Sequence, residues 1–134
     1  AAWLMGVKVS MINNSSCICT LKYRWINQNP FKSIFWAAQG MAAEFATGVL
    51  LMREIELSNK NISMLLVDVE GKFTKKAIGK ISFKCDKGLM IKEKVSSLNS
   101  QKTKSTMWID SIGIDETGQE VSKFKFNWSI LLKE

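Results

Sequence analysis

The side chain with the clearest chemical potential is Glu44, the only ionisable group in the run from Ser33 to Met52. That run is 20 residues long and otherwise consists of apolar, small and uncharged polar residues, SIFWAAQGMAAEFATGVLLM. A carboxylate in such surroundings has either a pKa raised by desolvation or a dedicated partner, and groups perturbed in this way gather at functional sites. Glu44 is therefore the first candidate for acid–base or nucleophilic chemistry.

Histidine is absent from the chain, which narrows the possible chemistry. Ser-His-Asp and Cys-His catalysis, His-ligated zinc and a histidine base are all excluded. The glycines fall in turns such as Asp86-Lys87-Gly88, so no glycine-rich phosphate loop is present either. Carboxylates and lysines remain for acid–base work, and we expect no cofactor and no metal site.

Three interpretations of the apolar run compete. A transmembrane helix is the first, because about 20 apolar residues span a bilayer, but Gln39 and Glu44 oppose it and no second span follows. A structural core helix, covered by protein on every side, is the second. The third is the same buried helix with Glu44 as its working group. The last two share one architecture, and on that basis we expect no membrane span.

The chain is basic, with 19 Lys and Arg residues against 12 Asp and Glu residues, a net charge of +7. A solvated lysine-rich surface is the simplest interpretation of this charge. Attraction of a phosphorylated small molecule is a second interpretation. Nucleic-acid binding is a third, but base and single-strand recognition favour arginine forks, and only Arg24 and Arg53 are present. We expect no nucleic-acid partner.

Length and composition favour a single soluble domain over residues 1–134, since 46% hydrophobic content is enough for a core. Three cysteines, Cys17, Cys19 and Cys85, form no CxxC motif. An odd number of cysteines without that motif indicates core thiols in a reducing compartment, so we expect a cytoplasmic protein.

The apolar run should be preceded by a strand and a turn. Apolar and polar residues alternate over 16–25, which predicts a half-buried strand, and Pro30 lies in the turn-rich stretch that follows. Ser33 is the predicted N-cap of the long helix, which should fade between Arg53 and Ser58. A short helical lead-in is expected at 1–7.

The remainder of the chain is predicted to form antiparallel strands. Residues 89–98 fit either a short helix or a bent strand. The other segments alternate as strands do, at 62–69, 77–85, 103–114 and 121–132. The order predicts an α+β fold, in which an antiparallel sheet wraps one long central helix.

This arrangement of residues resembles a known family. The segments NPFKSIF at 29–35 and MAAEFATG at 41–48 are similar to bacterial hotdog-fold proteins of the phenylacetyl-CoA and 4-hydroxybenzoyl-CoA thioesterase superfamily. The turn DETGQEV at 115–121 and the aromatic strand after it also look like that superfamily. The resemblance covers most of the chain from about Cys17 onward and implies a hotdog fold.

The resemblance also implies roles for individual residues. In those thioesterases a helix carboxylate acts as general base or nucleophile on the thioester, and Glu44 stands at the matching place. The backbone amide eight residues earlier, here of Trp36, serves as oxyanion donor. Asn29 matches a polar side chain that contacts the reacting carbonyl or the lytic water, and Thr47 is placed to bond the carboxylate or a water. Many members carry His-Gly-Gly at the helix start, whereas this chain has Phe35-Trp36-Ala37, whose indole is large enough to fill an acyl pocket.

Two wider expectations follow from the resemblance. The substrate would be an acyl-CoA or another acyl thioester, with the lysines available to the phosphates of coenzyme A, and the protein would be a homodimer or homotetramer. Hydration and dehydration chemistry on this fold needs a histidine, which the chain lacks. A hydrolase is thus favoured, with a non-catalytic module that binds acyl thioesters or fatty acids, or a purely structural assembly domain, as the alternatives.

Overall fold

The computed structural model describes residues 5–133, which form one antiparallel sheet and two α-helices. The strands are β1 (Val7–Ile12), β2 (Cys17–Lys22), β3 (Ile62–Phe73), β4 (Lys80–Cys85), β5 (Lys104–Ile114) and β6 (Glu120–Leu132). The helices are η1, a 3-10 turn (Trp25–Asn27), α1 (Trp36–Ser58) and α2 (Gly88–Ser96). Each of the strands expected from residue 16 onward is present, and 89–98 is mainly helical.

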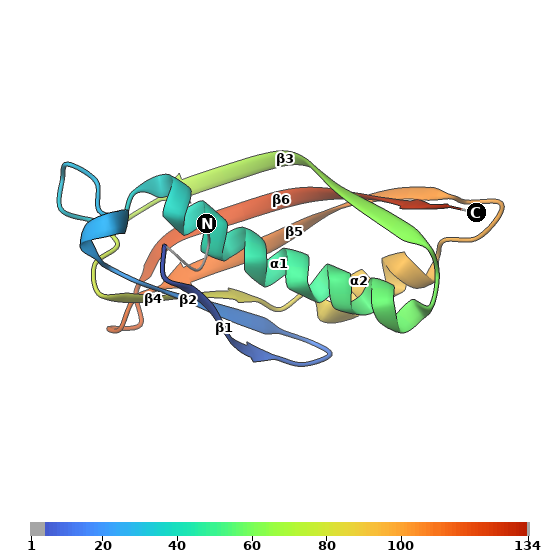
Figure 1. The fold of residues 1–134 in the computed structure, drawn as a ribbon, viewed down its shortest axis with the longest axis horizontal. Helices are drawn as coiled ribbons and strands as arrows, with labels where there is room; N and C mark the ends of the chain where they lie inside the picture. The colour runs from blue at the N-terminus through green and yellow to red at the C-terminus, as the bar shows by residue number, and fades with distance from the viewer. Residues whose placement is uncertain (1–4, 134) are drawn as a thin grey trace.

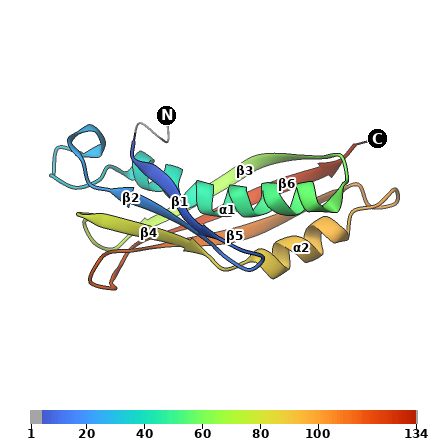
Figure 2. The same cartoon turned by 60° about the horizontal axis from the view of Figure 1, so that its bottom comes forward.

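The six strands form one sheet in the order β1-β2-β4-β5-β6-β3. Every neighbouring pair is antiparallel. Figure 1 shows α1 lying across one face of this sheet, and Figure 2 shows α2 beside the C-terminal half of α1. The predicted α+β fold, a sheet around one long helix, is confirmed.

Small residues allow α1 to lie close to the sheet. Gly40 and Gly48 pack against the rings of Phe124 and Trp128 on β6, where an added Cβ atom would lie 3.5 and 3.4 Å from the nearest ring atom. The buried face of the helix is made largely of alanines and leucines, Ala38, Ala42, Ala43, Ala46, Leu50 and Leu51. One side of the helix therefore faces a sheet of large side chains. The expectation that protein covers the helix on every side is wrong for a single chain, because Trp36, Phe45 and Met52 are exposed on its other side.

The N-terminus of α1 differs from the sequence prediction. The helix begins at Trp36 with Phe35 as its N-cap, and no side chain caps it. Ser33 was predicted as the cap, but its hydroxyl lies in a hydrogen-bonded turn with Asn29. The prediction failed because a local partner four residues away captured the capping side chain.

The C-terminus of α1 is closed by several interactions. Asn59 adopts a left-handed conformation with φ of 57° and ends the helix. Ser58 Oγ donates to the Ile55 carbonyl at 2.6 Å. Lys60 Nζ then donates to three carbonyls at the end of α2, those of Val95 at 3.2 Å, Ser96 at 3.3 Å and Leu98 at 2.8 Å. One lysine thus joins the ends of both helices.

The N-terminal segment also differs from expectation. The predicted helical lead-in at 1–7 lies partly outside the described residues, at 1–4. In its described part, Met5 and Gly6 form a turn and Val7 begins β1, a strand that the sequence analysis did not predict. Between residues 5 and 133, no helix combines the length and apolar character needed to cross a membrane.

Strand β3 forms one edge of the sheet and is only partly covered. It is 12 residues long and pairs with β6 on one side alone. Its exposed apolar side chains are Leu65, Val67, Val69 and Phe73, which are 65, 45, 53 and 49% exposed. An apolar edge strand of this length is a ready surface for pairing with another chain.

Candidate functional site

A cleft with a volume of about 500 Å³ lies at the N-terminus of α1. One wall is the loop and first turn of the helix, and the other is the end of β3 and the segment after it. Its lining residues are Asn29, Phe31, Ser33, Ile34, Phe35, Trp36, Gln39, Phe73, Thr74, Lys75, Lys76 and Ala77. Four aromatic side chains among a few polar groups suit a small organic ligand.

The helix start presents free hydrogen-bond donors to this cleft. The first N–H groups of any helix have no partner within it. Among the described residues, the N–H groups of Trp36 and Ala37 meet no acceptor, whereas Phe35 O accepts from the amides of Ala38 and Gln39. Together with the helix dipole, these two N–H groups favour developing negative charge.

Trp36 lines the cleft without filling it. Its side chain is 68% exposed, as the first residue of α1. Within a single chain, the indole therefore leaves the cleft open.

Asn29 lies in the cleft wall, and its side chain is bonded within the local turn. Its Oδ1 accepts from the amides of Phe31 at 2.9 Å and Ser33 at 3.2 Å, and its Nδ2 donates to Ser33 Oγ at 2.9 Å. The residue shapes the turn that leads into α1. Its Oδ1 would have to exchange one of these bonds to accept from a ligand, whereas Nδ2 has a second hydrogen that these bonds do not use.

Gln39 is a site residue that the sequence analysis did not select. Its side chain is 4% exposed, and its Nε2 donates to the Ile34 carbonyl at 3.1 Å. Because Nε2 must face that carbonyl, the other amide atom is the oxygen, and Oε1 has no partner among the described residues. An unpaired buried acceptor costs about 1–3 kcal/mol. Only a structure shows such an atom, because glutamine in a helix is otherwise unremarkable.

Glu44 lies two turns further along α1, between Gly40 and Gly48. These glycines place it on the helix stripe that faces Phe124 and Trp128 of β6. The carboxylate is half-buried and has no hydrogen bond or ion pair to any described residue. Burial raises the pKa of Glu44 above its ordinary value. This is the desolvated state that the sequence analysis anticipated as one of two possibilities.

Thr47 is buried, but its hydroxyl does not serve Glu44's carboxylate. Its Oγ1 donates to the backbone carbonyl of Glu44 at 2.8 Å and accepts from Trp128 Nε1 at 3.0 Å. The threonine thus ties α1 to β6, and its predicted contact with the carboxylate or with an active-site water is not among its bonds in this structure.

The four predicted residues fall into two groups. Asn29 and Trp36 line the cleft, whereas Glu44 and Thr47 do not. Eight residues of α-helix separate Trp36 from Glu44, which is about 12 Å along the helix axis. Within one chain, the Trp36 amide and the Glu44 carboxylate are too far apart to contact the same carbonyl group.

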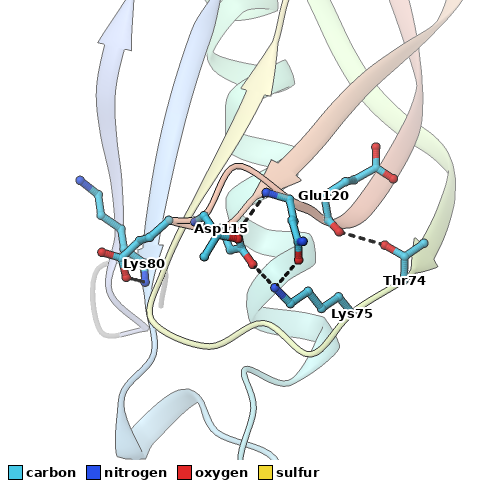
Figure 3. A network of polar contacts seen from close by, with 8 residues as sticks. Thr74, Lys75, Lys80, Asp115 and Glu120 are labelled. Carbon is cyan, nitrogen blue, oxygen red and sulfur yellow. Dashed lines mark hydrogen bonds and ion pairs between the residues drawn. The ribbon is translucent and has the colours of Figure 1, made fainter.

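A polar network fixes the second wall of the cleft. Figure 3 shows Lys75 at its centre, where Nζ lies 2.6 Å from Asp115 Oδ2 and 2.7 Å from Gln119 Oε1. Hydrogen bonds from Lys75 and Thr117 lower the pKa of Asp115 well below its usual range. Lys76, the next residue, donates from Nζ to the Phe31 carbonyl at 3.3 Å, which joins the two walls.

The remaining candidate ligand groups are dispersed or buried. Within residues 5–133, no three Cys, Asp or Glu side chains are grouped as a metal site requires. Cys17, Cys19 and Cys85 are free thiols in the core, as expected. Burial raises the pKa of Cys85 to about 12, so it is a thiol at neutral pH.

Solved structures with this architecture are known. A Pseudomonas aeruginosa protein of unknown function, described as a "probable thioesterase", matches with a TM-score of 0.83 at 14% identity, over 98% of this chain and 86% of that one. A Staphylococcus aureus thioesterase with a glutamine replaced by alanine matches at 0.74 and 10% identity, over 96% of both chains. The same protein with a glutamate replaced by alanine matches at 0.70 and 10%, over 98% of both. The chain therefore has the hotdog fold of these thioesterases.

Sequence comparison gives the family. No curated protein matches the chain. A family model described as "Domain of unknown function (DUF4442)" matches residues 3–130, nearly the whole sequence. The chain belongs to this family of unknown function, whose member here is built on the hotdog fold.

Proposed function

We propose that this protein is a thioesterase that hydrolyses acyl thioesters such as acyl-CoA, with Glu44 as general base or nucleophile. The observation that carries the proposal is a half-buried carboxylate of raised pKa on the same helix whose first residue, Trp36, lines the cleft and has a free N–H group. A base with a pKa raised toward neutrality accepts a proton more readily than an ordinary glutamate.

The chemistry needs no other group. Glu44 takes a proton from water, the water oxygen bonds to the thioester carbon, and the negative charge on the carbonyl oxygen is held by the N–H groups of Trp36 and Ala37. The carbon–sulfur bond then breaks, and the thiolate leaves with the proton. In the nucleophilic variant, the carboxylate oxygen itself attacks the carbon, the carbon–sulfur bond breaks and the thiolate leaves, and water then hydrolyses the resulting anhydride to free acid and the restored Glu44 carboxylate.

Two copies of the chain are required by this proposal. The 12 Å between the Trp36 amide and Glu44 means that a partner must supply one of them. The edge strand β3 is the surface that would bring a second copy close, since it is long, apolar and unpaired on its outer side. The active unit is thus a homodimer with two composite sites, and a tetramer would repeat them.

The S. aureus structures support the choice of residues. Their replaced glutamine and glutamate are fifteen residues apart in that chain. Asn29 and Glu44 are also fifteen residues apart here, with an amide and a carboxylate in the same order. Asn29 stands in this proposal as the residue that orients the reacting carbonyl or the water.

The test is release of free thiol from short, medium, long and aromatic acyl-CoAs by the wild type and by Glu44→Gln. We expect turnover by the wild type and a loss of at least about 10³-fold in the variant, with an unchanged fold. No release from any substrate by a folded wild type would contradict the proposal and leave a binding module.

A mixing experiment tests the composite site. Glu44→Gln and Trp36→Pro chains are each expected to be inactive, and we expect their co-refolded mixture to recover about one quarter of wild-type activity, because half of randomly paired dimers hold one intact site. A mixture as inactive as its components would contradict the two-copy site.

A further inference from the structure

We propose that a basic pocket on the outer face of β1, β2 and β4 binds the phosphate groups of the acyl carrier, coenzyme A. The inference rests on the proposed function and adds to it a binding site for the carrier's phosphates. The pocket has a volume of about 220 Å³ and is lined by Gly6, Lys8, Thr20, Lys22, Arg24 and Lys80.

The cations converge because of strand register. Lys8 on β1 pairs with Thr20 on β2, and Lys22 on β2 pairs with Lys80 on β4. Residues two apart on a strand share a face, so Thr20 and Lys22 bring both pairs to the same side of the sheet. All of these lysines are exposed.

This convergence is unfavourable without a ligand. Like charges directly opposite one another on neighbouring strands destabilise a sheet. Within residues 5–133, none of the ion pairs includes Lys8, Lys22, Arg24 or Lys80. Glu116 contacts the Lys80 backbone N–H at 3.0 Å, while Figure 3 shows the Lys80 side chain extending away from the network around Asp115. A phosphate would relieve the repulsion that the protein leaves uncompensated.

The backbone around the pocket is held by a buried side chain. Asn27 is 0% exposed; its Oδ1 accepts from the Arg24 amide at 2.8 Å, and its Nδ2 donates to the carbonyls of Lys22 at 2.7 Å and Met5 at 3.0 Å. Gly6, at φ of +86°, leaves room for the Arg24 guanidinium, whose atoms lie 3.5 Å from where a Cβ would stand. The backbone that carries Lys22 and Arg24 is therefore held in place by hydrogen bonds of a buried side chain.

The position of the pocket suits a carrier that also reaches the cleft. Ala77 lines the cleft and Lys80 lines the pocket, and three residues of extended chain span at most about 11 Å. A flexible pantetheine arm can cover that separation, with its phosphates in the pocket and its thioester end in the cleft.

The experiment measures equilibrium binding of three probes, coenzyme A, dephospho-coenzyme A and pantetheine. The proteins are the wild type, Lys22→Gln/Lys80→Gln, and the control Lys87→Gln/Lys92→Gln, which removes the same charge near the opposite end of β4. We expect coenzyme A to bind at least about tenfold more tightly than pantetheine to the wild type and the control, and this preference to be lost in Lys22→Gln/Lys80→Gln. Dephospho-coenzyme A should fall between the two.

Other results would overturn the proposal. Equal affinity for coenzyme A and pantetheine, or an equal loss in both double variants, would mean that the basic chain attracts anions diffusely. A single-stranded oligonucleotide that displaces coenzyme A and binds more tightly than coenzyme A would show that the pocket belongs to a nucleic-acid-binding surface. Arg24→Gln, which leaves both lysines in place, should repeat the loss in part.

Turnover separates this proposal from the proposed function. Binding needs no hydrolysis. If the protein bound coenzyme A through the pocket but released no thiol, the proposed thioesterase activity would be contradicted and the proposed pocket would not. Hydrolysis of acyl-CoA and acyl-pantetheine with equal kcat/KM would contradict the pocket alone.

Discussion

The two ends of α1 differ in how their polar groups are satisfied. At the C-terminal end, Asn59 closes the helix and Lys60 Nζ binds three carbonyls at the end of α2. At the N-terminal end, no side chain caps the helix, the amides of Trp36 and Ala37 are free, and Gln39 Oε1 is buried without a partner. The fold therefore satisfies the polar groups at the C-terminal end of α1 and leaves some of those at its N-terminal end without a partner.

This difference teaches where to look for chemistry. Native proteins satisfy nearly all buried polar groups, so the unpaired Oε1 of Gln39 beside the cleft needs an explanation. A ligand with a carbonyl oxygen would satisfy the free amides and complete the N-terminal end as Lys60 completes the other.

The largest expected effect comes from removing one donor at the open end. Trp36→Pro deletes the free N–H, while proline suits the first position of a helix and the extended Phe35, at φ −72° and ψ 155°, suits the residue before it. We expect kcat to fall about 10²–10³-fold with little change in melting temperature. Trp36→Ala, which keeps the N–H and removes the indole, is the control and should retain most activity. Equal losses in the two variants would assign the effect to the ring.

The opposite result is expected at the closed end. Lys60→Met keeps the aliphatic stem but removes three bonds to carbonyls, so the free energy of unfolding should fall by about 1.5–3 kcal/mol. Hydrolysis at a temperature where the variant is folded should stay within about twofold of the wild type. Denaturant unfolding of Lys92→Met, an exposed lysine on α2, provides the control. If Lys60→Met lost activity while folded, this would contradict the view that only the N-terminal end of α1 takes part in hydrolysis.

Two buried polar side chains of α1 sharpen the comparison further. Thr47→Val should cost about 1–3 kcal/mol because it leaves Trp128 Nε1 unpaired in the core. Gln39→Met should change stability by less than about 1 kcal/mol, since the lost bond to the Ile34 carbonyl is offset by removal of the unpaired Oε1. Chemical denaturation measures both. A large destabilisation by Gln39→Met would show that Oε1 is satisfied in solution.

The smallest effect concerns Glu44, between the two ends. In the folded chain the pKa of Glu44 is raised above the ordinary 4.5, so the folded chain binds this proton more strongly than the unfolded chain. Stability therefore falls as pH rises from the unfolded-state pKa through the folded-state pKa, because the carboxylate becomes charged. Glu44→Gln removes this penalty. Near pH 7 we expect the variant to melt about 1–3 °C above the wild type, a small difference because solvent screens a half-buried group. Near pH 4 the two proteins should melt at the same temperature. Thermal scans at both pH values measure this, and a variant that melts lower at pH 7 would contradict it.

Periodicity predicted most of the fold. The alternation along β5 and β6 and the apolar run of α1 follow directly from burial on one face, so these elements lie close to where the sequence placed them. Local side-chain competition was harder to predict, as at Ser33, whose hydroxyl bonds Asn29 instead of capping the helix. β1 was missed although Val7, Val9 and Met11 alternate with Lys8 and Ser10, because residues 1–7 were interpreted as a helical lead-in.

The candidate site was predictable only in part. Glu44 is conspicuous in the sequence because a charge interrupts an apolar run. The unpaired atom of Gln39 depends on which carbonyl its amide meets, and the basic pocket depends on strand register, so neither leaves a trace in spacing along the chain. Whether Asn29, Trp36, Glu44 and Thr47 act together stays a prediction.

The edge strand β3 has a consequence for the life of the chain before assembly. A 12-residue strand with Leu65, Val67, Val69 and Phe73 exposed can template the addition of any extended peptide, including the unfolded chain itself. Until a second copy covers this edge, pairing with that copy competes with the addition of unfolded chains. The surface proposed to build the site is thus also the surface that dimerisation would protect from aggregation.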